Sequence, residues 1–194
     1  MGVEVRQFGP ECLARYERVS IAFHVESVFR VEDADGGLVG LRLVEQPVAE
    51  PYGIDYDERK QERPSRWPQR FDTSRWGFFL AIDGAETVGG AAVAWRSANL
   101  WLLGGGDDLA ALWDIRVAPR RRGQGVGTAL FERAADYARR LGCRRLKIET
   151  QNINVLACRF YAARGCRLGC IDRHGYAGVA GAADEVMLLW YLDL

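Results

Sequence analysis

The chain has 194 residues, of which 48% are apolar and 27% charged, a composition typical of a folded globular protein and too hydrophobic for a disordered one. The 26 basic residues equal the 26 acidic ones, so the formal net charge is zero. At this length we expect a single domain over residues 1–194. Zero net charge argues against a dedicated nucleic-acid-binding protein, which would carry an excess of positive charge.

The N-terminal residues, the hydropathy and the cysteines indicate a cytoplasmic protein. Glu4 and Arg6 stand where a signal peptide would begin its apolar run, and no stretch reaches the roughly 18 apolar residues of a membrane-spanning helix. The five cysteines include no C-x-x-C pair, and the chain has two histidines. We therefore expect free thiols, no membrane partner and no metal site.

The first half of the chain predicts strands joined by irregular segments. Asp83-Gly84 is a strong hairpin signal between two of these strands. Residues 45–72 contain four prolines and predict a long irregular segment, which is unusual inside a compact domain and often functional. The apolar or β-branched runs that predict strands cover residues 28–32, 38–44, 76–82 and 87–95.

The second half alternates strand and helix. Apolar positions recur every three or four residues over 125–141 and predict a helix there. A shorter helix is expected over about 154–164, with Asn154 as a candidate N-cap and Gly165 as a candidate stop. The whole pattern defines an α+β (mixed α/β) fold. The strands expected around these helices cover residues 112–117, 145–150, 168–173 and 185–192.

The most informative stretch is Val-Ala-Pro-Arg-Arg-Arg-Gly-Gln-Gly-Val-Gly-Thr at residues 117–128, between a strand and a helix. Glycines at a helix N-terminus let an anion approach the unpaired backbone N–H groups, and the arginines at 120–122 suit phosphate. The stretch lacks both the G-x-G-x-x-G of dinucleotide-binding proteins and the Gly-Lys of a P-loop. An R-x-x-G-x-G pattern remains, formed by Arg122, Gly125 and Gly127; a tight turn without a ligand is the alternative.

Two motifs carry a family resemblance. The pattern from Asp114 to Thr128 resembles the acetyl-CoA pyrophosphate loop of the GNAT superfamily of N-acetyltransferases. Further on, Asn154-x-x-Ala-x-x-Phe-Tyr161-x-x-x-Gly165 resembles the second signature of that superfamily. The run Glu-Thr-Gln-Asn-Ile-Asn-Val-Leu-Ala-Cys-Arg-Phe-Tyr at 149–161 is similar to the streptothricin acetyltransferases, which modify an antibiotic.

This resemblance implies a single N-acetyltransferase domain with a central, twisted, mostly antiparallel sheet that splays between its middle strands and is flanked by helices. Residues 76–194 would form the acetyl-CoA-binding core, and the weakly family-like residues 1–75 would add strands and a substrate loop. It also implies acetyl-CoA as cosubstrate, held in part by the backbone of residues 115–117. The residues that the resemblance assigns to the cofactor are Ile115, Val117, Arg122, Gly123, Gln124, Gly125, Val126, Gly127, Thr128 and Asn154.

Direct acetyl transfer to a primary amine requires proton transfers that side chains can serve. An alkylammonium with a pKa of about 10.4 must first lose a proton, and Asp114 and Glu149 are the candidate bases. Ion pairs with neighbouring basic residues on their strands (Arg116 and Lys147) are the alternative role for these carboxylates. Tyr161 is, by resemblance, the general acid for the leaving thiolate. A packing role for Tyr161 and a purely capping role for Asn154 are the alternatives.

The neutral chain conceals two oppositely charged regions. Residues 116–147 carry ten basic and two acidic residues, around the expected cofactor phosphates. Residues 45–58 carry five acidic residues and no basic one, beside two tyrosines. Such a segment suits a cationic amine, although a solvated loop is the alternative. The expected substrate-binding residues are Glu45, Tyr52, Asp55 and Asp57.

The sequence thus predicts an acetyl-CoA-dependent N-acetyltransferase acting on a small cationic amine such as streptothricin, with a role in antibiotic resistance. Acetylation of a protein N-terminus, a lysine or a polyamine is the second interpretation. A non-catalytic acetyl-CoA-binding module is the third. We expect a small-molecule amine as partner and no nucleic acid, and a homodimer stays open.

Overall fold

The computed structural model describes residues 2–59, 63–104 and 106–194. Its contacts divide the chain into two compact units. The first unit contains the residues up to 22, residues 55–148 and residues 193–194. The second unit contains residues 23–54 and 149–192. Strand β7 (Arg145–Gln151) begins in the first unit and ends in the second.

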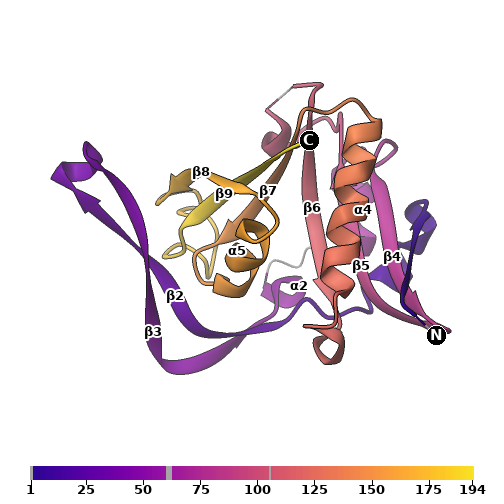
Figure 1. The fold of residues 1–194 in the computed structure, drawn as a ribbon, viewed down its shortest axis with the longest axis horizontal. Helices are drawn as coiled ribbons and strands as arrows, with labels where there is room; N and C mark the ends of the chain where they lie inside the picture. Colours follow the sequence, from indigo (N-terminus) through magenta and orange to yellow (C-terminus); the bar gives the residue numbers. More distant parts are fainter. Residues whose placement is uncertain (1, 60–62, 105) are drawn as a thin grey trace. The chain divides into compact units, whose positions relative to one another are not determined.

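The first unit is built on strands in the order β1-β4-β5-β6-β7 (Figure 1). The pairs β1–β4, β4–β5 and β5–β6 are antiparallel, and β6–β7 is parallel. The hairpin expected around Asp83-Gly84 is confirmed, since β4 pairs with β5 across it. The strands wholly within this unit are β1 (Glu4–Phe8), β4 (Gly77–Asp83), β5 (Glu86–Ala94) and β6 (Leu109–Val117).

Helix α4 (Val126–Arg140) covers these strands and confirms the helix predicted over 125–141. Its buried face contacts β4, β5 and β6, and each large apolar side chain buried there contributes about 1.5 to 3 kcal/mol. The buried residues of α4 are Val126, Leu130, Phe131, Ala134, Ala135 and Ala138. The other helices of the unit are short: α1 (Leu13–Tyr16), α2 (Tyr56–Arg59) and α3 (Trp67–Arg70). Single 3₁₀ turns cover Pro10–Cys12, Pro64–Arg66, Trp101–Leu103 and Pro119–Arg121.

A glycine in β5 allows Tyr16 to lie directly on the sheet. A Cβ at Gly90 would stand 2.6 Å from Cε2 of Tyr16, so any larger residue would push the ring away. The Tyr16 side chain is fully buried, and its hydroxyl reaches Asp114 on β6. Helix α1 is therefore tied to the centre of the unit through one aromatic residue.

Strand β6 is irregular next to Asp114, one of the two predicted bases. Ala92 of β5 faces Asp114, while the next residue, Val93, faces Leu112, so Trp113 is the extra residue of a β-bulge. The parallel pairing of β6 with β7 covers four residue pairs and ends at Leu112 and Ile148, although β6 continues to Val117. This confirms the predicted splay of the middle strands, and in the described pairing residues 115–117 are bonded to β5.

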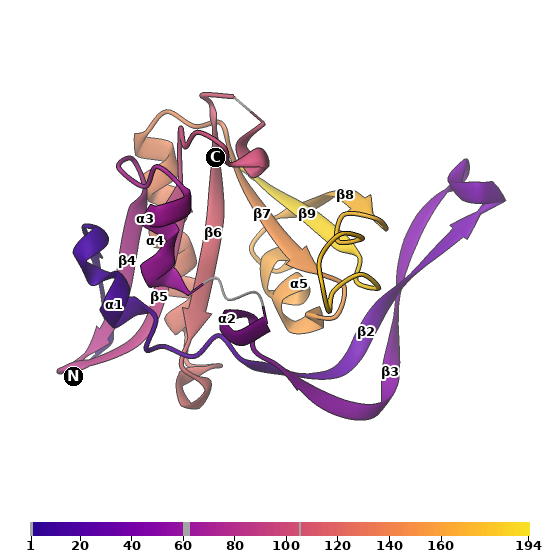
Figure 2. The same cartoon turned by 180° about the vertical axis from the view of Figure 1, so that it is seen from behind.

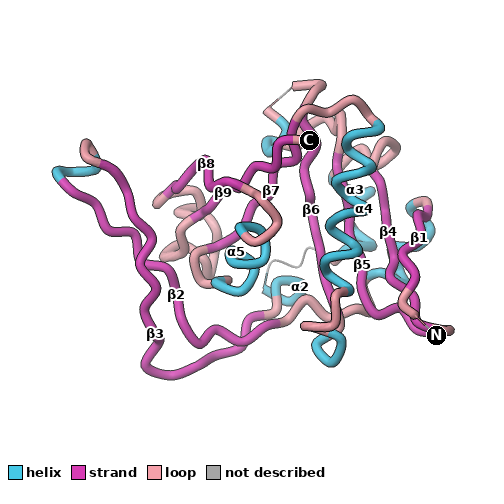
Figure 3. The backbone as a smooth tube through the Cα atoms, viewed as in Figure 1, coloured by secondary structure: helices cyan, strands magenta, loops and turns pink. Residues whose placement is uncertain are grey.

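The second unit contains a long two-stranded ribbon, helix α5, and a pair of closing strands (Figure 3). The ribbon pairs β2 (Phe23–Ala34) with β3 (Gly40–Ile54) in antiparallel fashion. Its base packs through a cluster of Val25, Val28 and Ile153. The strands β8 (Arg167–Asp172) and β9 (Met187–Asp193) are antiparallel, and β9 lies between β8 and the end of β7. Helix α5 spans Val155–Ala162.

The expectation of an irregular segment over 45–72 is wrong for its first part. Strand β3 runs through Pro47 and Pro51 as far as Ile54. In a two-stranded ribbon each strand has an edge without a neighbouring strand, and proline is tolerated at edges and bulges because its missing N–H costs no ladder bond there. Pro47 faces Ser27, next to a shift in register between Val25 and Ser27. The remainder of the segment holds α2, a 3₁₀ turn and α3.

The chain is thus a mixed α+β protein, and the predicted fold class is confirmed. Among the described residues, no helix is both long and apolar enough to span a membrane.

Candidate active site

The glycine-rich loop between β6 and α4 has an open backbone. Gly123 and Gly125 adopt φ angles of +73° and +83°, which side chains other than glycine rarely adopt. A Cβ built on either glycine would have no atom within 4 Å. Helix α4 begins at Val126 with no side chain capping its N-terminus. The first-turn N–H groups and the bare glycine backbone therefore form a cradle that fits a phosphate group.

The three arginines of this loop, expected from sequence to lie beside a phosphate, each contact other groups of the protein. Arg120 and Arg121 form ion pairs with Glu86 and Asp83. Arg122 donates from Nε to the carbonyl of Val117 (3.0 Å) and from Nη2 to the carbonyl of Ala22 (2.7 Å). These contacts fix the arginines around the loop, while the glycines expose its backbone N–H groups.

The other predicted cofactor residues of this loop fall on the same stretch. Val126 is buried, so its side chain packs in the core and only its backbone faces the loop. The side chain of Gln124 donates to the carbonyl of Arg120 (2.9 Å). Gly127 and Thr128 lie in the first turn of α4 and are half-buried. Ile115 and Val117 lie on β6, beyond the last residue that pairs with β7.

Asp114, one of the two predicted bases, belongs to a buried ion-pair network. Arg116 donates to it from Nε (2.9 Å) and Nη2 (2.7 Å), and Tyr16 donates to it from Oη (2.6 Å). The same guanidinium binds Asp57 through Nη1 (2.7 Å) and Nη2 (3.1 Å). The ion pair with Arg116 that the sequence offered as the alternative for Asp114 is therefore present.

The electrostatics of this network favour a charged Arg116 and a neutral Tyr16. Burial opposes the charge on Arg116, but the Asp114 carboxylate and the hydrogen bonds to Asp114 and Asp57 raise the pKa of the guanidinium overall. Burial, reinforced by the Asp114 carboxylate, raises the pKa of Tyr16 well above its ordinary value. The Arg116 side chain is 1% exposed and that of Asp114 is 7% exposed. Asp114 could thus take a proton from a substrate only by giving up its ion pair.

In the second unit, helix α5 carries the predicted acid and the predicted asparagine. Asn154 caps α5, because its Oδ1 accepts from the N–H of Ala157 at 3.2 Å. The capping role is therefore confirmed, and it uses the oxygen of the side-chain amide. The nitrogen of the same amide, Nδ2, is a hydrogen-bond donor. Tyr161 lies two turns later, is 5% exposed and packs edge-on against Phe160. Gly165 has a φ of +81°, as expected of the residue that stops the helix.

Glu149, the other predicted base, accepts a hydrogen bond from the hydroxyl of Tyr176 at 2.5 Å. Lys147, which the sequence offered as the alternative ion-pair partner of Glu149, lies over the ring of Trp101, with Nζ 5.5 Å from the ring centroid. Gln151 donates from Nε2 to the same Tyr176 hydroxyl at 2.9 Å. Sequence reasoning missed Tyr176, although it is the one aromatic side chain in the Gly- and Ala-rich stretch 173–186.

The acidic residues of 45–58 do not form one uncompensated patch. Glu45 forms an ion pair with Arg159 of α5, and Asp57 is bound by Arg116. Asp55 accepts from the N–H of Asp57 at 2.9 Å. Tyr52 is 40% exposed on β3. Glu45 and Tyr52 belong to the second unit and Asp55 and Asp57 to the first, so the structure does not gather the four within one unit.

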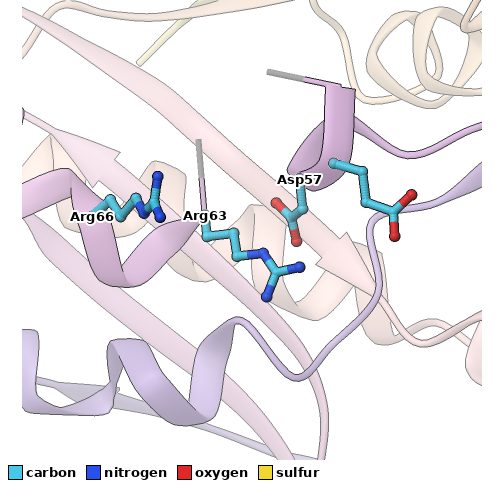
Figure 4. Close-up of a pocket in the computed structure, with 4 residues that line it drawn as sticks. Asp57, Arg63 and Arg66 are labelled. Carbon is cyan, nitrogen blue, oxygen red and sulfur yellow. The ribbon is translucent and has the colours of Figure 1, made fainter. Parts of the chain in front are cut away.

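A cavity of about 360 Å³ lies in the first unit, lined by Asp57, Glu58, Arg63 and Arg66. Asp57 comes from α2, and Arg63 and Arg66 come from the segment that leads into α3 (Figure 4). The lining is mixed in charge, with two carboxylates and two guanidinium groups. It could hold an amine next to the carboxylates and a carbonyl or carboxylate next to the arginines.

The five cysteines are free, as expected, and four of them are buried: Cys12, Cys143, Cys158 and Cys166. Burial raises the pKa of Cys12 and Cys166 to about 11 and that of Cys158 to about 12, so these thiols are poor nucleophiles. Within residues 2–59, 63–104 and 106–194, no group of three His, Cys, Asp or Glu side chains is placed to bind a metal ion.

A comparison with protein families gives the class of protein that has this fold and this glycine-rich loop. The model of the acetyltransferase (GNAT) family matches residues 42–166, which is more than half of the chain. The chain therefore belongs to the GNAT family.

Three relatives are streptothricin acetyltransferases. That of Escherichia coli is 30% identical over 184 residues, which cover 94% of this chain and 91% of that protein. Streptothricin acetyltransferase A of Bacillus subtilis (strain 168) is 39% identical over 82 residues, or 42% of this chain and 47% of that protein. The streptothricin acetyltransferase of Streptomyces lavendulae is 33% identical over 113 residues, which cover 57% of this chain and 55% of that protein. The last two matches span about half the length of each relative.

Solved structures share the fold. A crystal structure of nourseothricin acetyltransferase is similar with a TM-score of 0.76 and 27% identity, covering 100% of this chain and 99% of that one. A GNAT family acetyltransferase from Elizabethkingia anophelis with acetyl-CoA bound has a TM-score of 0.56 and 17% identity. The match covers 87% of this chain and 99% of that one. The second likeness concerns the fold alone.

Proposed function

We propose that the chain is an acetyl-CoA-dependent N-acetyltransferase that transfers acetyl directly to a primary amine of a small cationic molecule such as streptothricin. The observation that carries this proposal is the similarity to a streptothricin acetyltransferase over nearly the whole chain. The local geometry of each unit supports it, because the first unit has an open glycine-rich loop and the second has Glu149 beside a tyrosine hydroxyl.

The first unit supplies the cofactor cradle. Gly123 and Gly125 leave room for phosphate oxygens against the backbone, and the uncapped start of α4 adds N–H groups and the positive end of the helix dipole. The backbone of residues 115–117, past the end of the β6–β7 pairing, would bind the pantetheine arm and polarise the thioester carbonyl. Acetyl-CoA, when bound there, supplies an activated acyl group.

The second unit supplies the proton-transfer groups. We assign the base to Glu149, since Asp114 is committed to Arg116 and Tyr16. Glu149 takes a proton from the substrate ammonium, directly or through water, and the amine becomes a nucleophile. Tyr161 gives its phenolic proton to the sulfur as the C–S bond breaks and the C–N bond forms. The second proton lost by the nitrogen restores the phenol of Tyr161, and Glu149 releases the first proton to solvent, so one proton is released for each acetyl group transferred.

The substrate-binding residues of this proposal are the acidic and aromatic groups of β3 and α2. Asp55 and Asp57 would attract an ammonium group, and the ion pair of Asp57 with Arg116 fixes the position of that carboxylate. Glu45 and the exposed ring of Tyr52 would contact the rest of a long cationic chain. A lysine-type side chain with free amines, as in streptothricin, has this character.

The proposal is tested by thiol release from acetyl-CoA in the presence of streptothricin, spermidine and a lysine-containing peptide. We expect turnover with streptothricin and much lower kcat/KM with the peptide. Turnover confined to the peptide or to spermidine would replace the substrate class while keeping the chemistry. Tight binding of acetyl-CoA without thiol release for any amine would overturn the catalytic proposal in favour of a binding module.

A further inference from the structure

The loop between β8 and β9 carries a buried tyrosine. Residues 173–186 form turns without a helix or strand, coloured yellow between β8 and β9 in Figure 2. Glycine and alanine make up half of the loop, yet Tyr176 is 3% exposed. Hydrogen bonds from Ala177 N–H to the carbonyl of His174 (3.0 Å) and from Val179 N–H to that of Tyr176 (2.8 Å) shape the backbone around it. A long loop of this kind in a compact fold is usually functional.

The hydroxyl of Tyr176 joins two side chains of β7. It donates to Oε1 of Glu149 at 2.5 Å and accepts from Nε2 of Gln151 at 2.9 Å. Residues two apart on a strand point to the same face, so Glu149 and Gln151 can flank one hydroxyl. A phenol has a single proton, and the amide of Gln151 approaches as a donor, so that proton is directed to Glu149. The three groups belong to the same unit.

We propose that Tyr176 is a positioning residue for acetyl transfer, which holds the carboxylate of Glu149 so that its other oxygen, Oε2, receives the proton of the substrate ammonium. This rests on the proposed function and on Glu149 as base. Tyr176 keeps its own proton throughout, and Gln151 sets the direction of the hydroxyl. The gain is geometric, because a base that is already oriented loses less freedom when the substrate binds.

The variant that tests this role is Tyr176→Phe, which keeps the buried ring and removes the hydroxyl. We expect kcat to fall about 10- to 100-fold with little change in the KM for acetyl-CoA. Tyr137→Phe is the matched control, since Tyr137 lies on α4 in the other unit and packs against Phe79. This control is expected to keep full activity.

A double-mutant cycle separates positioning from mere support of the fold. If Tyr176 acts through Glu149, Tyr176→Phe costs far less kcat in a Glu149→Gln background than in the native one. An equal loss in both backgrounds, or no loss in the native one, would overturn the role of Tyr176 alone. A native chain that acetylates no amine would overturn the proposed function together with this role.

A crystal structure of Tyr176→Phe provides a readout that needs no activity. The proposal predicts that the Glu149 carboxylate occupies more than one rotamer or moves away from its native position. A Glu149 side chain in a single, unchanged rotamer would show that Tyr176 does not hold it, and would overturn the inference.

Discussion

Arg116 and Asp57, which are 59 positions apart in the chain, form a two-pronged ion pair with N–O distances of 2.7 and 3.1 Å. The guanidinium also binds Asp114, so one buried arginine links helix α2 to the strand that bears the predicted cofactor backbone. The α2 segment, expected from sequence to be irregular, is therefore anchored to strand β6 through this arginine.

Removing this anchor should destabilise the fold. Arg116→Met leaves two carboxylates without their counter-ion, so we expect the free energy of unfolding to fall by about 3 to 5 kcal/mol. Asp57→Asn should lower the free energy of unfolding by less, because the Asp57 side chain is 15% exposed. Urea denaturation followed by circular dichroism measures both. Arg42→Gln, which breaks the exposed pair with Glu32, is the control and should leave the midpoint unchanged. An equal midpoint for Arg116→Met and the control would show that the network is not structural.

Two glycine substitutions can separate an effect on acetyl-CoA affinity from an effect of backbone strain on stability. Gly125→Ala places a methyl group in the space above the loop and forces alanine to a φ of +83°. We expect a stability loss of about 1 to 2 kcal/mol and weaker acetyl-CoA binding, measured by isothermal titration calorimetry. Gly142→Ala is the matched control, since Gly142 has a φ of +79° and equally open surroundings at the far end of α4. It should lose similar stability and no affinity. Equal affinity for both variants would remove the cradle from the cofactor site.

Asn154 offers a test of two roles in one side chain. Asn154→Asp keeps the oxygen that caps Ala157 and removes the amide donor, so stability should be preserved while acetyl-CoA affinity falls. Asn154→Ala should lose both, with about 1 kcal/mol of stability from the missing cap. Unchanged cofactor affinity in Asn154→Asp would leave the residue with the capping role alone.

Tyr161→Phe is expected to keep acetyl-CoA affinity and to lose one to two orders of magnitude in kcat, because the phenol supplies the proton for the leaving thiolate. Steady-state kinetics with titration calorimetry distinguish the outcomes. Full activity would exclude Tyr161 from the chemistry. A parallel loss of affinity would assign it to cofactor binding.

The buried cysteines predict a loss of stability at alkaline pH. Burial raises the pKa of Cys158 from 9.0 to about 12, so between these values the unfolded chain has released a proton that the folded chain retains. The contribution of this thiol to the free energy of unfolding is therefore fully present below about pH 9. Between about pH 9 and pH 12 it falls by about 1.4 kcal/mol per pH unit. Cys158→Ala should show a shallower decline in urea midpoint between pH 9 and 11. Identical slopes would contradict the assignment.

Local patterns in the sequence predict the elements whose periodicity is strong. Helix α4 and the β4–β5 hairpin follow from spacing and turn residues alone. Strand β3 was not predicted in full, since its prolines are acceptable only at the free edge of a ribbon, which is a property of the pairing. Strand β1 is short and largely exposed, so it carries little hydrophobic signal.

Local sequence predicts candidate site residues but not their partners. Asp114 and Arg116 share a strand face, and their ion pair could be anticipated from alternation. The contacts of Tyr16 with Asp114 and of Tyr176 with Glu149 join residues 98 and 27 positions apart. No local pattern specifies such pairs. They show that Asp114 is committed to a buried ion pair and that Glu149 accepts a hydrogen bond from a phenol.

Direct acetyl transfer to an amine is tested most directly by mass spectrometry of the product. Streptothricin is incubated with the purified chain and acetyl-CoA, and the released thiol is measured in parallel. We predict one acetyl group on a side-chain amine of streptothricin, in equal amount to the released coenzyme A. Unmodified streptothricin, whether or not thiol is released, would contradict this account.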